Sequence, residues 1–262
     1  MRLLTLRGDH REMGLQHGRQ LFDLRPLIVE AMDRRLAHLK DEAATDLLEE
    51  LEQAWTEHAR STLDMLAGIA EALHLDLARL LGYAAASYLA DRLQAASRPE
   101  ACTVWAASGD GSPILAKNRD YSLAHLPLQA VAVATPSEGY RYVYVTSAGS
   151  PAVFSSGMNE EGLAVADTHV SSPDLGPGLA RYTLMMEMLE RHTSVASALD
   201  YLGRVPRMGG GNLILADADG EMAVFEAGHR HVGVVSAENH VVVATNHFVT
   251  PALRGQHTGA GG

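Results

Sequence analysis

The 262-residue chain contains only one cysteine, Cys102. A single cysteine cannot form an internal disulfide, and no group of cysteines and histidines has the spacing of a zinc finger. A phosphate-binding loop is missing as well, since MGGGNLIL opens a predicted strand and not a helix. We therefore expect no metal and no organic cofactor.

Basic residues are also scarce, with 21 Lys and Arg against 32 Asp and Glu and a formal net charge of -11. No block of Lys or Arg stands out, which argues against nucleic acid and anionic membranes as partners. No apolar run is long enough to span a bilayer, and the first residues, MRLLTLRGDHREMG, become charged too early for a signal peptide. We expect a soluble, cytoplasmic protein, and its 47% hydrophobic residues are enough for a full core.

The two parts of the chain differ in hydrophobic pattern. Residues 11–96 place Leu, Ala, Met and Ile at three- and four-residue spacing, which predicts helices that pack on a core. Asp76 is the expected N-cap of a helix that runs from Leu77 towards Leu93.

From Cys102 onward, short β-rich runs alternate with turn residues. These runs include CTVWAAS, SPILAKN, LQAVAVAT, YRYVYVTS, HVGVVS and HVVVATNHF, and GNLILADADGEMAVFEAG predicts a hairpin that turns at Asp217 to Gly220. PAVFSSGMNEEGLAVADTHV predicts two more strands, and LARYTLMMEMLERHTSVASALDYLGR predicts helix. Helices, strands, helices and strands in this order favour an α+β fold over alternating βαβ units.

Cys102 lies where the helical part meets the sheet part, directly after the linker-like ASRPEA. A lone cysteine in a strand is commonly a small buried hydrophobe. A hairpin that turns near Gly109 to Gly111, however, brings Asn118 and Asp120 close to Cys102. A cysteine attacks as the thiolate and needs a base, either a histidine or its own α-amine if Cys102 became the first residue.

The segment ACTVWAASGDGSPILAKNRDY resembles the start of the mature catalytic subunit in the penicillin acyltransferase family of N-terminal nucleophile hydrolases. It is also similar to the start of bile-salt and penicillin V amidases. GDHREMGLQHGRQL, LAGIAEALHLDLARLLGY, GMNEEGLAV and ATNHF resemble further family segments in the same order, so the resemblance covers most of the chain. It implies a four-layer αββα fold, a helical segment over residues 1–101, a catalytic part over residues 102–262, and self-cleavage between Ala101 and Cys102.

The resemblance also implies roles for three residues. Cys102 would be the nucleophile in its own release and again in amide cleavage, through a thioester. Asp120 would orient the α-amine of Cys102. Asn246, in ATNHF, would donate its side-chain NH₂ to the oxyanion.

Further candidates lie around these three. Relatives place an asparagine near Thr168 or His169 as a second oxyanion donor. This sequence has none there, so either a backbone N–H serves or His169 acts as a base. Lys117 lies where bile-salt hydrolases carry an arginine, although a solvated lysine at a strand edge fits the sequence equally well. Asn118 and Tyr121 complete the candidates for contacts with substrate.

One family feature has no clear counterpart. The family carries another functional arginine well beyond the Thr-Asn motif, whereas Arg254 follows that motif closely. We therefore expect either a chain shortened at its C-terminal end or a site that is completed differently.

Three functions stay open from the sequence. The first is a self-processing cysteine amidohydrolase or acyltransferase whose two fragments stay associated. Its substrates would be linear amides, such as N-acyl amino acids, small peptides or β-lactam side chains, with an acyl donor in the transferase case. The second is a Cys-His thiol hydrolase that uses His169 or His247 without self-cleavage, and the third is a non-catalytic binding protein with Cys102 buried. The sequence leaves the oligomeric state open, a homo-oligomer included.

Overall fold

The computed structural model describes residues 1–37, 42–93, 101–109, 113–120 and 122–256. Its N-terminal part is mainly helical, as the spacing of apolar residues predicted. The elements there are β1 (Arg2–Gly8), α1 (His10–Gln20), η1 (Phe22–Leu24), α2 (Arg25–Leu36), α3 (Glu42–His58), α4 (Arg60–Leu73), α5 (Leu77–Ala84) and α6 (Ala86–Arg92).

The predicted cap at Asp76 is confirmed, because its Oδ1 accepts a hydrogen bond from the N–H of Arg79 at 2.8 Å. The helix that follows is shorter than predicted. It ends at Ala84, and a second helix begins at Ala86, so that α5 and α6 replace one continuous helix.

The predicted β-rich runs also form strands. The elements of this part are β2 (Ala101–Ala107), β3 (Ile114–Asp120), η2 (Leu123–Leu128), β4 (Gln129–Pro136), β5 (Tyr142–Ser147), β6 (Ser156–Asn159), β7 (Ala164–His169), α7 (Arg181–Arg191), α8 (Val195–Arg204), β8 (Gly211–Ala216), β9 (Met222–Ala227), β10 (Val232–Ser236) and β11 (Val241–Ala244). The hairpin of β8 and β9 turns where predicted, with the N–H of Gly220 donating to the carbonyl of Asp217 at 3.1 Å.

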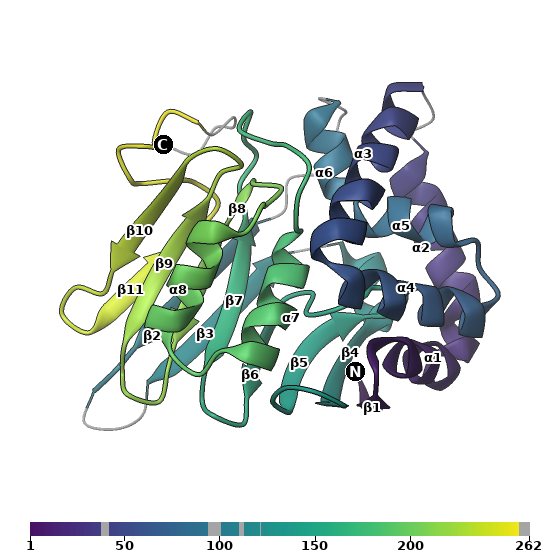
Figure 1. The fold of residues 1–262 in the computed structure, drawn as a ribbon, viewed down its shortest axis with the longest axis horizontal. Helices are drawn as coiled ribbons and strands as arrows, with labels where there is room; N and C mark the ends of the chain where they lie inside the picture. The colour runs from purple at the N-terminus through teal and green to yellow at the C-terminus, as the bar shows by residue number, and fades with distance from the viewer. Residues whose placement is uncertain (38–41, 94–100, 110–112, 121, 257–262) are drawn as a thin grey trace.

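The described strands form two sheets. One has eight strands in the order β1-β4-β5-β6-β7-β8-β9-β10, and the other has three in the order β11-β2-β3. Helices α7 and α8 lie over one face of the larger sheet, and the helices of the N-terminal part stand beside them (Figure 1). The α+β class is confirmed. Within the described residues, helices cover the larger sheet, and none covers the outer face of the smaller one.

Strand β1 is the one element of the N-terminal part that the sequence analysis did not predict. It pairs in parallel with β4, from Arg2 opposite Ala130 to Gly8 opposite Pro136. Its side chains Leu4 and Leu6 are buried in the core. The N-terminal part therefore completes the edge of the large sheet.

Two apolar layers hold the sheets and helices together. The larger layer lies between the eight-stranded sheet and the helices, and the smaller one lies between the two sheets. In the smaller layer, Val104 and Ala106 of β2 pack with Ala166 and Ile214 of the larger sheet. Every second residue of β2 is buried, so the period-2 pattern of this strand points Cys102 towards the same interior side.

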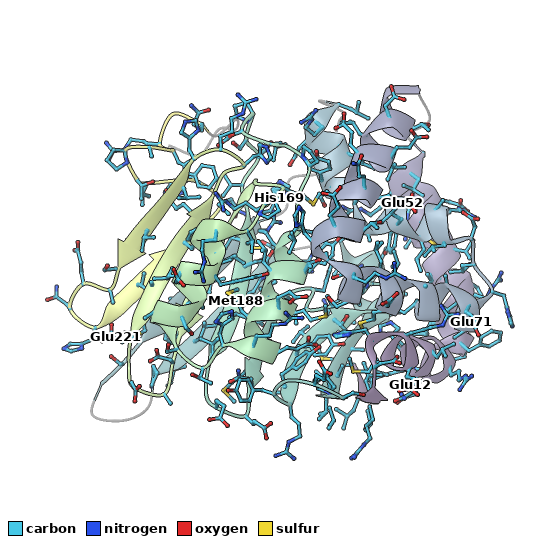
Figure 2. All side chains as sticks on the ribbon, in the orientation of Figure 1. Glu12, Glu52, Glu71, His169, Met188 and Glu221 are labelled. Carbon is cyan, nitrogen blue, oxygen red and sulfur yellow. The ribbon has the colours of Figure 1, made fainter. Side chains whose placement is uncertain are left out.

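Several of the acidic residues lie on the surface. Figure 2 labels Glu12, Glu52, Glu71 and Glu221, all of which are exposed, whereas Met188 is fully buried. The four labelled glutamates are thus solvated.

Helices α1 and α4 pack so closely that a side chain would not fit between them. A Cβ atom built on Gly14 would lie 2.1 Å from the carbonyl oxygen of Met65, and one on Gly68 would lie 2.3 Å from that of Arg11. Backbone atoms cannot yield as a flexible side chain can, so the helices would have to move apart.

We expect Gly14→Ala to lower the free energy of unfolding by about 2–3 kcal/mol through this overpacking. Gly203 in α8 is the matched control, because a Cβ there meets nothing within 4 Å. Gly203→Ala should instead raise stability by about 0.5 kcal/mol, the usual gain in a helix. Urea unfolding of both variants measures the difference, and equal effects would contradict the packing argument.

His17 of α1 is fully buried, and its Nε2 accepts a hydrogen bond from the N–H of Gly149 at 3.2 Å. Burial lowers the pKa of the His17 imidazole from 6.5 to about 4. Between these pH values the unfolded chain binds a proton that the folded chain does not bind. Above pH 6.5, His17 therefore does not lower the free energy of unfolding. Below pH 6.5, its titration lowers the free energy of unfolding as the pH drops towards 4.

We expect the titration of His17 to lower the free energy of unfolding by about 3 kcal/mol once the pH is below both pKa values, at ~1.4 kcal/mol per pKa unit. His17→Gln keeps a side-chain acceptor for Gly149 but does not titrate. Its unfolding free energy should therefore vary less between pH 6.5 and 4 than that of the wild type. Urea unfolding at a series of pH values measures both slopes, and parallel slopes would exclude His17 as the cause.

Candidate active site

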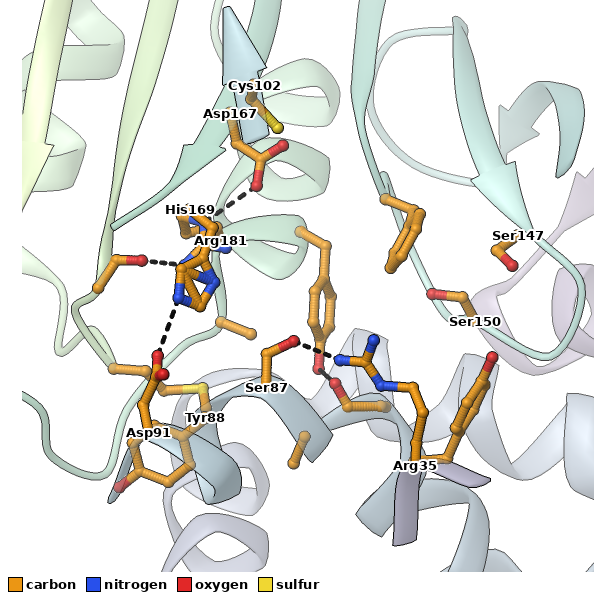
Figure 3. Close-up of a pocket in the computed structure, with 18 of the residues that line it drawn as sticks. Arg35, Ser87, Tyr88, Asp91, Cys102, Ser147, Ser150, Asp167, His169 and Arg181 are labelled. Carbon is orange, nitrogen blue, oxygen red and sulfur yellow. Dashed lines mark hydrogen bonds and ion pairs between the residues drawn. The ribbon is translucent and has the colours of Figure 1, made fainter. Parts of the chain in front are cut away.

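Cys102 is the second residue of β2, and its side chain points into a pocket between the sheets and the helical part (Figure 3). The residue is 7% exposed. Arg119 of β3 lies directly opposite it in the strand pair. Cys102 is thus a largely buried thiol at the wall of a pocket.

The pocket is built where the helical part meets the sheets. Helices α2, α5 and α6 form one side, and β2, β3, β7 and the start of α7 form the other. Its apolar lining residues include Tyr83, Ala84, Tyr88, Phe154, Leu175 and Met208. A pocket lined by both apolar side chains and a few polar groups is typical of a site for an organic molecule.

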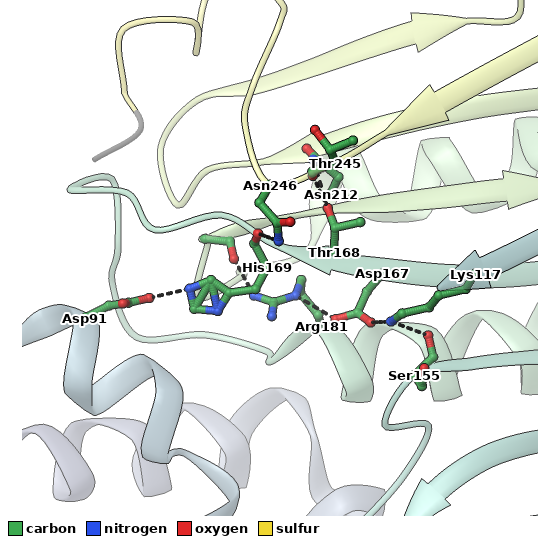
Figure 4. A network of polar contacts seen from close by, with 11 residues as sticks. Asp91, Lys117, Ser155, Asp167, Thr168, His169, Arg181, Asn212, Thr245 and Asn246 are labelled. Atoms are coloured by element: carbon green, nitrogen blue, oxygen red, sulfur yellow. Dashed lines mark hydrogen bonds and ion pairs between the residues drawn. The ribbon is translucent and has the colours of Figure 1, made fainter. Parts of the chain in front are cut away.

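Asn246 contacts the nucleophile candidate directly. Its Oδ1 accepts a hydrogen bond from the backbone N–H of Cys102 at 2.7 Å. Its Nδ2 donates to the carbonyl of His169, also at 2.7 Å (Figure 4). The fold therefore brings Asn246 to Cys102 although 144 positions separate them in the chain.

A buried hydrogen-bond network holds the segment that carries Asn246. The hydroxyl of Thr168 donates to the carbonyl of Thr245 at 2.6 Å, and Asn212 Nδ2 donates to that same carbonyl at 3.0 Å. Asn212 also donates to the carbonyl of His247 at 3.2 Å. Thr168 is fully buried, so its side chain fixes this segment and does not line the pocket.

Three charged side chains lie together at the Cys102 end of the pocket. Lys117 Nζ contacts Asp167 Oδ1 at 2.6 Å, and Arg181 Nε contacts Asp167 Oδ2 at 3.0 Å (Figure 4). Burial by itself raises the pKa of the Asp167 carboxyl, but the two cations outweigh it and hold that pKa well below its usual range. The Lys117 side chain is 6% exposed, which excludes a solvated lysine at a strand edge.

His169 connects the site to the helical part. Its Nε2 lies 2.9 Å from Asp91 Oδ2 of α6, and both residues line the pocket. His247, the other histidine considered as a base, has its Nδ1 2.8 Å from the Thr245 hydroxyl. The residues described as lining the pocket include His169 but not His247.

Asp120 and Asn118 lie on the same hairpin as Cys102, as the predicted strand pairing requires. Asp120 lies opposite Ala101 in the strand pair, and Asn118 lies opposite Thr103. Asp120 and Asn118 are both exposed. Neighbours along a strand point to opposite faces, so Arg119 shares the inward face with Cys102. Tyr121 lies outside the described residues.

Four further residues in and around the pocket were not predicted from the sequence: Asp167, Arg181, Asp91 and Asn212. A partial signal existed for Asp167, because it lies two residues before His169 on a predicted strand and therefore shares its face. Arg181 and Asp91 lie in helices where nothing local distinguishes them from surface charges. Their place depends on how the helical part packs on the sheet.

Among the described residues, no group of three or more His, Cys, Asp or Glu residues is arranged to hold a metal ion. None of the described helices is both long and apolar enough to cross a membrane.

A family model for acyl-coenzyme A:6-aminopenicillanic acid acyl-transferase matches residues 106–258, more than half of the chain. The chain belongs to this family. The family resemblance seen in the sequence is thereby confirmed. The matched region includes Lys117, Asp120, Asp167 and Asn246, and it begins just after Cys102.

Two solved structures are also similar to part of the chain. A conjugated bile acid hydrolase from Clostridium perfringens is 16% identical, over 53% of this chain and 52% of that one, with a TM-score of 0.44. A penicillin V acylase from Agrobacterium tumefaciens is 21% identical, over 55% of this chain and 43% of that one, with a TM-score of 0.34. The chain thus spans about half the length of these structures or less. No curated protein matches it in sequence.

Proposed function

We propose that the chain is a self-processing cysteine enzyme that cleaves linear amide bonds after its own Ala101–Cys102 bond is cut. The observation that carries this proposal is the hydrogen bond from the N–H of Cys102 to Asn246 Oδ1 at 2.7 Å. It holds the nitrogen of the bond to be cut, while the thiol of the same residue lines a pocket. Membership of an acyltransferase family supports the class of reaction.

The first reaction is the cleavage of the chain. The Cys102 Sγ attacks the carbonyl carbon of Ala101, the C–N bond breaks, and the nitrogen takes the thiol proton and becomes the α-amine of Cys102. Water then hydrolyses the Ala101 thioester, which releases the Ala101 carboxyl group and restores the thiol. Asn246 Oδ1 can accept a hydrogen bond from the nitrogen before and after this step.

The second reaction is amide cleavage. The α-amine accepts the thiol proton, the thiolate attacks the substrate carbonyl, and the substrate amine leaves with a proton. Water, or an acceptor amine in acyl transfer, then resolves the thioester. Asp120, opposite Ala101 at the cut end of the strand, would orient the α-amine through a charge-assisted hydrogen bond.

Asn246 would stabilise the oxyanion of both reactions. An amide NH₂ has two N–H bonds, and Asn246 uses one on the carbonyl of His169. The other is proposed to donate to the oxyanion. Because the hydroxyl of Thr168 is engaged by Thr245, a second donor at this strand end would come from the backbone.

The two fragments are proposed to stay together after cleavage. The indole N–H of Trp55 donates to the carbonyl of Gly178 at 3.0 Å, and the hydroxyl of Tyr182 donates to the carbonyl of Ala84 at 3.1 Å. Trp55 is fully buried in a core to which both fragments contribute. Separating them would expose this apolar surface to water.

One observation favours a second candidate, a Cys-His thiol hydrolase that acts without self-cleavage. His169 lines the same pocket as Cys102, and Asp91 lies 2.9 Å from its Nε2. A histidine oriented by a carboxylate is a common base for a cysteine nucleophile.

Intact-mass measurement and N-terminal sequencing of the purified protein separate the two candidates. Self-processing gives pieces of about 11 and about 17 kDa, which share the 28.1 kDa of the chain in proportion to length, and the larger begins Cys-Thr-Val-Trp. An uncut chain whose Cys102 reacts with iodoacetamide and which hydrolyses amides favours the Cys-His hydrolase. An uncut chain with no reactive thiol and no turnover would contradict both.

A further inference from the structure

The pocket has a second polar end, away from the nucleophile. There, Arg35 Nη2 of α2 donates to the hydroxyl of Ser87 in α6 at 2.6 Å. Figure 3 shows Arg35 entering the pocket from the helices and Cys102 entering it from β2, at opposite ends of the view. Both residues line the same pocket, so one molecule can contact both.

Ser147, at the end of β5, adds a polar group that no other described residue satisfies. The residue is 1% exposed, and its Oγ has no hydrogen-bond partner among the described residues. A buried hydroxyl without a partner destabilises a folded protein, so such groups commonly have a ligand or water as their partner. Ser147 lines the pocket, where a bound molecule can supply that partner.

Among the described residues, cations outnumber carboxylates in the pocket, whereas the chain as a whole is acidic. Among the described lining residues, four are cationic, and two, Asp91 and Asp167, are carboxylates. Asp167 is paired with Lys117 and Arg181. Asp91 is paired with His169. A positively charged pocket in a chain of net charge -11 raises the local concentration of anions and repels cations.

We propose that Arg35, with the hydroxyls of Ser87 and Ser147, binds a carboxylate of the substrate and so selects anionic amides. The planar guanidinium can donate two parallel hydrogen bonds to a carboxylate, and the serine hydroxyls can donate further ones. The scissile carbonyl then lies at Cys102, and the apolar lining residues of the pocket contact the part between. This inference rests on the proposed function, since it names the substrate class of the same site.

Two matched substrate pairs test the turnover of anionic amides. Glutaryl p-nitroanilide and valeryl p-nitroanilide differ in a carboxylate on the acyl side, and phenylacetylglycine and phenylacetylglycinamide differ in one on the amine side. We expect the wild type to prefer the charged member of one pair by about 10-fold or more in kcat/KM, the value of a charge-assisted hydrogen bond. Equal turnover of the charged and the neutral member in both pairs would overturn the proposal.

The variant Arg35→Gln should remove most of this preference, mainly by raising KM for the charged substrate, and Arg35→Lys should restore part of it. Arg34→Gln is the matched control, because Arg34 is the exposed neighbour on the same helix and pairs with Glu30. It should keep the wild-type preference. Ser147→Ala should lower the preference about threefold without removing a charge. Equal effects of Arg34→Gln and Arg35→Gln would overturn the proposal.

A binding experiment separates this proposal from the proposed function. Calorimetry with Cys102→Ala and either phenylacetylglycine or glutaryl p-nitroanilide needs no catalysis. Binding that is at least about 10-fold weaker when Arg35→Gln is added supports the carboxylate subsite, even if the wild type turns over none of the four amides. The opposite result is that the wild type turns over the neutral amides, while neither anionic amide binds more tightly than its neutral counterpart. That result would overturn the proposed carboxylate subsite and leave the proposed function intact.

Discussion

Cys102→Ala is expected to remain a single chain of 28.1 kDa and to show no measurable turnover of a linear amide. The proposed cleavage and the proposed catalysis both need the thiol as nucleophile, and a methyl group cannot form the thioester. Intact mass, N-terminal sequencing and an amide assay on wild type and variant measure both consequences. The small buried side chain should cost little stability, so the variant should fold.

Cys102→Ser is the graded control for this experiment. A hydroxyl in the same place keeps a nucleophile but is far less ionised than a thiol. We expect cleavage that is slow but detectable over days, and turnover well below that of the wild type. Cleavage of Cys102→Ala at the same bond and rate as the wild type would show that another group cuts the chain, and the self-processing proposal would fail.

Asn246→Ala is expected to lower kcat by about 10²-fold or more, with a much smaller rise in KM. A preorganised oxyanion donor acts mainly in the transition state, and the loss of one such donor has an effect of this size. The contact of Asn246 Oδ1 with the N–H of Cys102 adds a second reason, because the variant also frees the nucleophile's nitrogen. Steady-state kinetics on a linear amide and the melting temperature are the paired measurements.

Asn246→Asp separates the two contacts of this side chain. The carboxylate can still accept from Cys102, but it cannot donate to the carbonyl of His169 or to an oxyanion. We therefore expect self-cleavage and turnover to be as slow as in Asn246→Ala if donation matters. A normal kcat in Asn246→Ala with a lowered melting temperature would place Asn246 in the scaffold and leave the oxyanion to backbone N–H groups.

Thr168→Val provides the matching test of the support beneath Asn246. It removes the hydroxyl that donates to the carbonyl of Thr245 and changes the volume little. If Thr168 acts only by holding the Thr245–Asn246 segment, the variant should lose less activity than Asn246→Ala and should lower the melting temperature more. A loss of kcat as large as that of Asn246→Ala at unchanged melting temperature would point to a direct role in the reaction.

The sequence by itself determined the local elements and the family. Apolar spacing predicted the helices over residues 11–96 and the strands from Cys102 onward, since these periodicities reflect which side of an element is buried. The cap at Asp76 and the turn from Asp217 to Gly220 were predicted because both depend on residues within one turn of each other. The motifs around Cys102 indicated the family that the comparison confirmed.

Only the tertiary structure decided which side chains share the pocket. Strand pairing predicted that the end of β3 lies beside Cys102, but a register that differs by one residue exchanges the two faces. The observed register therefore puts Arg119 on the inward face with Cys102 and turns Asp120 outward. Local pattern could not settle this, because the length and shape of the turn set the register.

The same limit applies to contacts between distant segments. The pairing of β1 with β4, the contact of Asp91 with His169, and the approach of Arg35 to the pocket all depend on how the helical part packs against the large sheet. That packing follows from the burial of many apolar side chains at once, and no single stretch encodes it. The sequence could therefore name a candidate nucleophile, whereas most of the charges and hydroxyls that surround its pocket become apparent only once the chain is folded.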